Sequence, residues 1–158
     1  MKIYFLRHAD AVDGDDDAMR PLSPLGRKQS EAIAAFLAKA DVNFGAAFTS
    51  PLVRAHQTAE IVLRSMGKMG DVKLRTAEAL LNETSDAEWN RWLESILDTK
   101  HVLLVGHAPT LAERVCALLT IENSSALRLA KGAVACVESE DRQCGQLKYL
   151  VTPKSLGL

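Results

Sequence analysis

The sequence predicts an α/β protein in three layers, with helices on both faces of a central, mostly parallel sheet. Two apolar runs without polar alternation, at 3–6 and 102–105, are typical of strands buried on both faces. Each run, like a third strand at 45–49, precedes apolar residues at helical spacing, and such alternation is typical of parallel sheets. The 158 residues have the length of one domain, so we expect a single domain over 1–158.

The first strand ends in Arg7-His8, and an acidic loop with Asp13–Asp17 follows it. The loop lacks the ligand spacing of an EF-hand, so we expect it to be solvated and close to the site. Ser23-Pro24 has the pattern of an N-cap and a first helical residue. Apolar residues then recur at helical spacing and predict an amphipathic helix from about 24 to 39.

Ser50-Pro51 follows the strand at 45–49 and predicts a second N-cap pair, for a helix that Gly67 ends. Arg54 then falls in or just after the first turn of that helix. Ser85 and Glu88 form a capping box for a later helix whose inward residues reach Leu97. The other predicted elements are an edge strand at 72–75, a loop at 80–84, a strand at 101–107, a helix opening at 108–110 and a hairpin of 133–137 with 146–151.

Composition excludes several classes of protein. The formal net charge of −1 argues against binding nucleic acid through bulk charge. The three cysteines lack CxxC spacing, which indicates reduced thiols and neither a disulfide framework nor a zinc site. No apolar run approaches the length that a membrane span needs. The apolar run at the start of the chain is too short for the hydrophobic region of a signal peptide. We therefore expect a cytoplasmic protein that requires no metal or cofactor.

Arginine and histidine side chains lie at three strand-to-helix junctions. Arg7 and His8 end the first strand, Arg54 lies early in the helix after the second, and His107 ends the strand at 101–107. If the strands are parallel, these junctions meet at one sheet edge, where helix N-termini add N–H donors and partial positive charge. Two arginines and two histidines there predict a site for a compact, multiply charged anion, and phosphate matches the bidentate geometry of arginine.

His8 is the expected nucleophile of this site. A phosphoryl acceptor needs an unprotonated nitrogen, and nearby guanidinium groups and helix N-termini disfavour the imidazolium form. The arginines would hold the phosphate and neutralise its oxygens in an in-line transition state. The expected path is a covalent phosphohistidine that water then hydrolyses, without a metal ion.

The chain resembles the histidine phosphatase superfamily, whose fold is phosphoglycerate mutase-like. The resemblance lies in four motifs that occur in the family's order: Leu6–Ala9, Leu22–Gln29, Thr49–Ala59 and Val105–Pro109. It implies that Arg7, His8, Arg54 and His107 form the phosphate pocket and that His8 is phosphorylated. The short chain, Ala9 in place of the usual glycine, and the segment Arg20–Ser23 are most similar to the SixA-type branch, which is associated with removing phosphate from histidine on phosphorelay proteins.

The resemblance also implies two further site residues. Arg20 would border the pocket. Mutases and small-ester phosphatases of the superfamily carry a glutamate proton donor after the third strand, and Leu81–Glu83 resembles that motif. An alkoxide leaving group needs a proton, whereas a protonated imidazole leaves neutral, so Glu83 as general acid would favour an ester substrate. Alternatively, Glu83 only precedes the helix cap at Ser85.

Three functions therefore remain open. The first is hydrolysis of phosphohistidine on a protein. The second is hydrolysis of a small phosphomonoester with Glu83 as the acid. The third is a phosphate- or phosphoprotein-binding module without turnover, which would need the arginines but no working nucleophile. The presence of both His8 and His107 favours an enzyme over the binding module.

Overall fold

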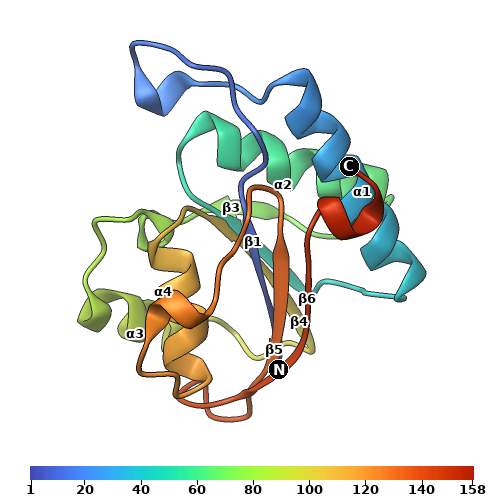
Figure 1. The fold of residues 1–158 in the computed structure, drawn as a ribbon. Helices are drawn as coiled ribbons and strands as arrows, with labels where there is room; N and C mark the ends of the chain where they lie inside the picture. The colour runs from blue at the N-terminus through green and yellow to red at the C-terminus, as the bar shows by residue number, and fades with distance from the viewer.

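The computed structural model describes residues 1–158 and contains one six-stranded sheet with the order β3-β2-β4-β1-β5-β6 (Figure 1). The strand at the first apolar run lies in the middle of this sheet. The four strands from β3 to β1 are parallel, while β5 runs antiparallel to both β1 and β6. The strands are β1 (Lys2–Arg7), β2 (Ala46–Thr49), β3 (Leu74–Thr76), β4 (His101–Gly106), β5 (Val134–Glu138) and β6 (Gln146–Val151).

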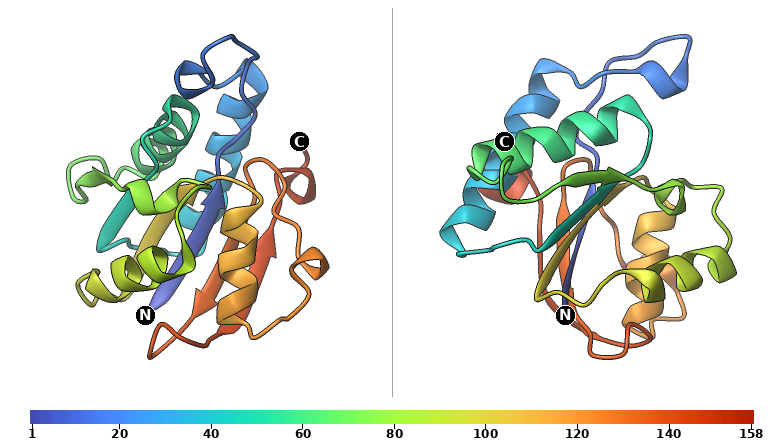
Figure 2. Two further views of the ribbon diagram at one scale, coloured as in Figure 1. Left: turned by 90° about the vertical axis from the view of Figure 1, so that its left-hand side faces the viewer. Right: turned by 180° about the vertical axis from the view of Figure 1, so that it is seen from behind.

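Two pairs of helices cover the two faces of the sheet, as Figure 2 shows. The first pair is α1 (Pro24–Lys39) and α2 (Val53–Ser65), and the second is α3 (Asp86–Ser95) and α4 (Thr110–Leu118). Each pair packs on its own apolar cluster against the sheet. The predicted three-layer α/β/α fold is therefore confirmed.

The alternation of side chains along β1 explains why both faces need a helix layer. Ile3 and Phe5 point into the cluster beneath α3 and α4, and Tyr4 and Leu6 into the cluster beneath α1 and α2. All four are at most 2% exposed. Full burial of such side chains contributes about 1.5–3 kcal/mol each, so β1 anchors both halves of the core.

The start of α1 is fixed to the chain that leaves β1. The Ser23 hydroxyl accepts the N–H of Gly26 at 3.0 Å, and Pro24 occupies the first helical position, as predicted. A Cβ at Gly26 would lie 1.9 Å from the carbonyl oxygen of Asp10. Glycine is therefore required here because helix and loop touch backbone to backbone.

Two predicted details are wrong. Ser50 is not the N-cap of α2, because the helix begins at Val53 with Leu52 in the cap position and without a side-chain cap. Helix α3 ends at Ser95, so Leu97 is 81% exposed and does not point inward. The other predicted elements are present, with a 3-10 turn at Glu78–Leu80 opening the expected loop. None of the helices combines the length and apolarity that crossing a membrane needs.

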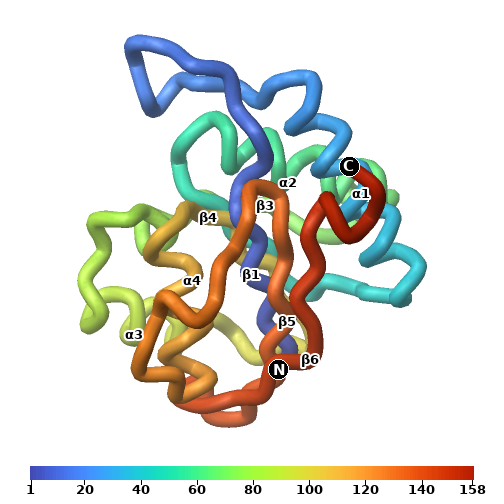
Figure 3. The backbone as a smooth tube through the Cα atoms, in the orientation of Figure 1, coloured from blue at the N-terminus to red at the C-terminus, as the bar shows by residue number.

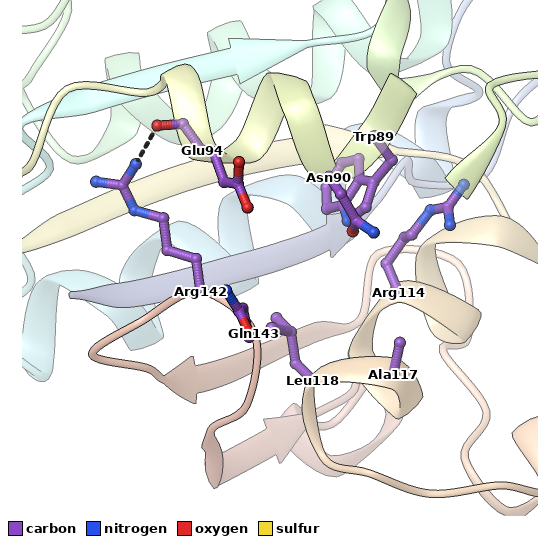
Figure 4. A pocket seen from close by; sticks show the side chains of 8 residues that line it. All are labelled: Trp89, Asn90, Glu94, Arg114, Ala117, Leu118, Arg142 and Gln143. Atoms are coloured by element: carbon purple, nitrogen blue, oxygen red, sulfur yellow. Dashed lines mark hydrogen bonds between the residues drawn. The ribbon is translucent and has the colours of Figure 1, made fainter. Parts of the chain in front are cut away.

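A long-range contact ends α3. The guanidinium of Arg142, from the β5–β6 hairpin, donates to the carbonyl oxygens of Leu93, Glu94 and Ile96 at 2.7–3.1 Å. Figure 4 shows the bond to Glu94. These carbonyls lie at the C-terminus of α3, where the last carbonyls of a helix lack the usual i+4 partner. The hollow of about 310 Å³ beside them also holds Arg114, whose guanidinium lies 5.4 Å from the centre of the Trp89 ring. These arginines have structural partners and lie apart from the predicted phosphate residues.

Candidate active site

The predicted site residues meet at the carboxyl edge of the parallel strands. The His8 N–H donates to the carbonyl of Gly106, the last residue of β4, at 3.0 Å, so His8 and His107 leave adjacent strands side by side. Their ring centroids are 5.0 Å apart. Arg54 reaches them from α2, with its Nε 3.4 Å from His8 Nε2. Figure 3 shows the chain beyond β1 extending past this edge before it returns into α1.

His8 is held with one ring nitrogen available. Its Nδ1 lies 2.8 Å from the carbonyl oxygen of Ala9, which only accepts, so the proton of the neutral ring belongs on Nδ1. The Nε2 lone pair then accepts the Nε–H of Arg54 at 3.4 Å. Burial, together with the charges of Arg54 and Arg7 and the neighbouring His107, lowers the pKa of His8 to about 3. His8 is therefore neutral near pH 7, with an unprotonated Nε2.

His107 is also neutral, and its orientation is fixed by Ser50. The Ser50 hydroxyl lies 2.6 Å from His107 Nε2 and is fully buried. Burial and the positive charge of Arg54 lower the pKa of His107 to about 4. The Ser50 oxygen also accepts the Leu52 N–H at 3.3 Å, which favours the hydroxyl donating its proton to Nε2. Nδ1–H of His107 is then a donor, and this buried atom has no hydrogen-bond partner.

Arg7 contributes a second unpaired donor. Its Nη1 donates to the Leu129 carbonyl at 2.9 Å, whereas its buried Nε has no partner. Burial and the nearby charge of Arg128 lower its pKa. Buried N–H groups are nearly always paired in folded proteins. The two unpaired donors, on Arg7 and His107, are therefore suited to a ligand that offers acceptor oxygens.

Asp17 connects Arg54 to Arg20. The Asp17 carboxylate accepts from Arg20 Nη1 at 3.0 Å and from Arg54 Nη2 at 3.1 Å, and the Asp17 carbonyl accepts from Arg54 Nη1 at 2.7 Å. The carboxylate's hydrogen bonds, first to Arg20 and then to Arg54, lower the pKa of Asp17. The structure thus places Arg20 beside Arg54 through a shared carboxylate. The acidic loop is mostly exposed, as expected, but one of its members reaches the site.

Glu83 makes no hydrogen bond or ion pair with this cluster. It is exposed and lines a separate hollow of about 280 Å³ with Glu78 and Glu88. The preceding residue, Asn82, does approach the site, since its amide donates to the Ala108 carbonyl at 3.0 Å. The structure therefore brings together Arg7, His8, Arg54 and His107, with Arg20 beside Arg54, while Glu83 lines a separate hollow.

Two site residues were not predicted from the sequence. The sequence predicts a helix cap at Ser50 and one of several solvated acids at Asp17. The signal for Ser50 was its place immediately after a strand that pairs with β4, where the neighbouring chain ends in His107. The signal for Asp17 was its spacing of three residues from Arg20. Neither signal identifies the partner in the site by itself.

Residues 3–90 match the sequence profile of the histidine phosphatase superfamily (branch 1), and the chain belongs to this family. It is 32% identical to an uncharacterized protein of Picosynechococcus over 99% of both chains. It is 28% identical to the phosphohistidine phosphatase SixA of Escherichia coli, over 99% of this chain and 96% of that one.

Solved structures agree on the fold. The structure of the protein histidine phosphatase SixA complexed with tungstate has a TM-score of 0.86 and 24% identity, and the match covers 99% of both chains. A phosphoserine phosphatase mutant of Entamoeba histolytica in complex with phosphoserine has a TM-score of 0.72 and 16% identity over 98% of both chains. Proteins named for different substrates thus share this fold. The fold therefore does not identify the substrate, and the residues of the site have to.

Proposed function

We propose that the chain is a phosphatase that forms a covalent phosphohistidine on His8 and acts on phosphohistidine carried by another protein. The observation that carries the proposal is an unprotonated His8 Nε2, hydrogen-bonded only to Arg54 Nε, together with two buried, unpaired donors on Arg7 and His107. A phosphoryl group needs a nucleophile on one side and donors around its oxygens. The membership in the histidine phosphatase superfamily and the similarity to SixA over nearly the whole chain support the same chemistry.

The reaction follows from these roles. His8 Nε2 attacks phosphorus and the N–P bond of the substrate histidine breaks. The substrate imidazole leaves neutral because its other ring nitrogen already carries a proton. Arg54, Arg7 Nε and His107 Nδ1–H donate to the three phosphoryl oxygens, where negative charge is concentrated. Water then attacks phosphorus, the His8–phosphorus bond breaks, and inorganic phosphate leaves. The low pKa of His8, about 3, keeps the nucleophile unprotonated throughout the neutral range.

The position of Glu83 supports phosphohistidine over a phosphoester. An alkoxide leaving group requires a general acid, whereas an imidazole leaving group leaves neutral once it is protonated. Glu83 is exposed and lines a hollow that contains none of the phosphate residues. Hydrolysis of a small phosphomonoester with Glu83 as acid is the alternative.

The test compares two substrates in the presence of EDTA. Rates are measured on a phosphohistidine-carrying protein and on p-nitrophenyl phosphate for the wild type, Glu83→Gln and the matched control Glu78→Gln, whose side chain lines the same hollow. We expect rapid hydrolysis of phosphohistidine and similar rates for all three proteins. Hydrolysis of the ester alone, abolished by Glu83→Gln and retained by Glu78→Gln, would favour the alternative. Activity that EDTA removes would contradict a metal-independent reaction.

A second measurement separates an enzyme from a binding module. His8→Asn removes the attacking nitrogen but leaves Arg7, Arg54 and His107 in place. We expect the variant to lose steady turnover and the acid-labile phosphoenzyme while it still binds inorganic phosphate. If the folded wild type also shows no turnover on any phosphorylated substrate but binds phosphate, the binding module is the better description.

A further inference from the structure

A positively charged groove begins at Arg7 and leads away from the phosphate site. It has a volume of about 570 Å³ and is lined by the end of β1, the loop before β5 and the turn after β6. In Figure 1 that turn lies beside α1. Four of its nine lining residues are cations and none is Asp or Glu. The cations are Arg7, Arg128, Lys131 and Lys154.

Much of this positive charge is uncompensated. Lys131 pairs with Asp10 at 2.8 Å, but Arg128 and Lys154 are exposed and make no ion pair or side-chain hydrogen bond. Arg128 also lies close enough to Arg7 for its charge to oppose that of the Arg7 guanidinium. The whole chain carries a net charge of −1, so this cluster is a local feature. A bound anionic group would relieve the repulsion.

The groove has a fixed position relative to the nucleophile. The Gly132 N–H donates to the carbonyls of both Arg7 and His8, at 3.2 and 3.1 Å. Gly132 has a φ of 73°, and a Cβ there would lie 2.9 Å from the Pro153 ring. The loop before β5 is thus tied to the catalytic dipeptide on one side and packed against the turn after β6 on the other. A group bound in the groove would lie at a defined place beside the phosphoryl group on His8.

A second hollow that Arg7 lines differs in charge. It has a volume of about 350 Å³ and is also lined by Glu113 and by several apolar residues near α4. Arg128 lines both hollows, but the lysines belong only to the groove toward β6. The groove toward β6 has four cations and no acid, whereas the hollow near α4 has Arg7 and Arg128 with Glu113, so an anionic partner that reaches Arg7 is favoured more on the β6 side.

We propose that this groove docks an acidic segment of the protein that carries the phosphohistidine, with carboxylates of that segment meeting Arg128 and Lys154. The proposal rests on the function proposed above and specifies its partner. Small-molecule sites are lined mainly by apolar and aromatic side chains, whereas this lining has no aromatic residue. Charged surfaces of this kind instead orient protein partners and raise association rates.

The test uses two synthetic phosphohistidine peptides of equal length, with the phosphohistidine flanked by glutamates in one and by glutamines in the other. The groove variant is Arg128→Ala/Lys154→Ala. The matched control is Lys73→Ala/Arg75→Ala, which removes the same charge from exposed positions at β3, on the opposite edge of the sheet. At low salt we expect the wild type and the control to prefer the glutamate peptide in kcat/KM by roughly threefold to tenfold. The preference should fall close to one in the groove variant.

Equal kcat/KM for the two peptides in the wild type, or the same preference in the groove variant and the control, would overturn the proposal. A fluorescein-labelled glutamate peptide without phosphate separates this failure from failure of the proposed function. If no phosphohistidine peptide is hydrolysed, weaker binding to Arg128→Ala/Lys154→Ala than to Lys73→Ala/Arg75→Ala in fluorescence anisotropy still supports an acidic ligand for the groove. Equal binding to both variants would refute it.

Discussion

Stability should fall steeply between pH 7 and pH 5 because two buried histidines stay neutral in the folded chain. The pKa is lowered to about 3 for His8 and to about 4 for His107. In the unfolded chain both return to ~6.5 and take up a proton as the pH falls. The unfolded state then binds more protons than the folded state, so the free energy of unfolding decreases with decreasing pH from ~6.5 downward.

The size of the effect follows from linkage. For a folded pKa near 3 or 4 and an unfolded pKa near 6.5, each histidine removes about 2 kcal/mol of stability between pH 7 and pH 5. The carboxylates whose pKa is lowered, such as Asp10 and Asp17, remain ionised in both states over most of this interval. The histidines therefore dominate the change, with a smaller contribution from His101, whose pKa burial also lowers.

The assay is urea unfolding at pH 7, 6 and 5 in buffers without phosphate. We expect His8→Asn to show a pH-dependent loss about 2 kcal/mol smaller than that of the wild type. The control is His56→Gln, since His56 is partly exposed on α2 beside Glu60. An identical loss in His8→Asn and the wild type would show that His8 is not held neutral by burial. Comparing the loss within each protein removes any effect of the substitution that does not depend on pH.

Asp17→Asn should lower the inhibition constant of inorganic phosphate roughly threefold, because it removes one exposed negative charge that competes with phosphate for Arg54. Product-inhibition kinetics test this prediction. An unchanged inhibition constant would mean that phosphate does not compete with Asp17. Arg142→Ala should lower the free energy of unfolding by about 1–3 kcal/mol through the lost bonds to the end of α3, measured by urea unfolding. Gly26→Ala should lower the free energy of unfolding by ~1–3 kcal/mol, because the added Cβ would clash with the Asp10 carbonyl. An unfolding midpoint equal to that of the wild type would contradict the clash.

Local sequence patterns predicted the elements whose causes are local. The burial of both faces of β1 follows from an apolar run without alternation, and the start of α1 follows from Ser23-Pro24. The meeting of Arg7, His8, Arg54 and His107 required only that the strands be parallel, because parallel strands end at one edge.

The errors arose where a distant residue determines the outcome. Helical spacing in α3 continues to Leu97, yet the helix stops at Ser95, where Arg142 pairs with its last carbonyls. The Ser50 hydroxyl lies next to His107 through strand pairing and not at a helix start. Both contacts join residues more than 40 positions apart, so no local pattern contains them.

The hydrogen bond between His8 and the Ala9 carbonyl has a consequence for chemical analysis of the phosphoenzyme. Because Nδ1 is occupied as a donor, phosphorylation at Nε2 would give the tele isomer of phosphohistidine and not the pros isomer. The two isomers are distinguished by antibodies and by long-range phosphorus–proton coupling. We expect the trapped phosphoenzyme to react only with antibodies specific for the tele isomer. A signal from the pros isomer would mean that the His8 ring flips by about 180° within the site.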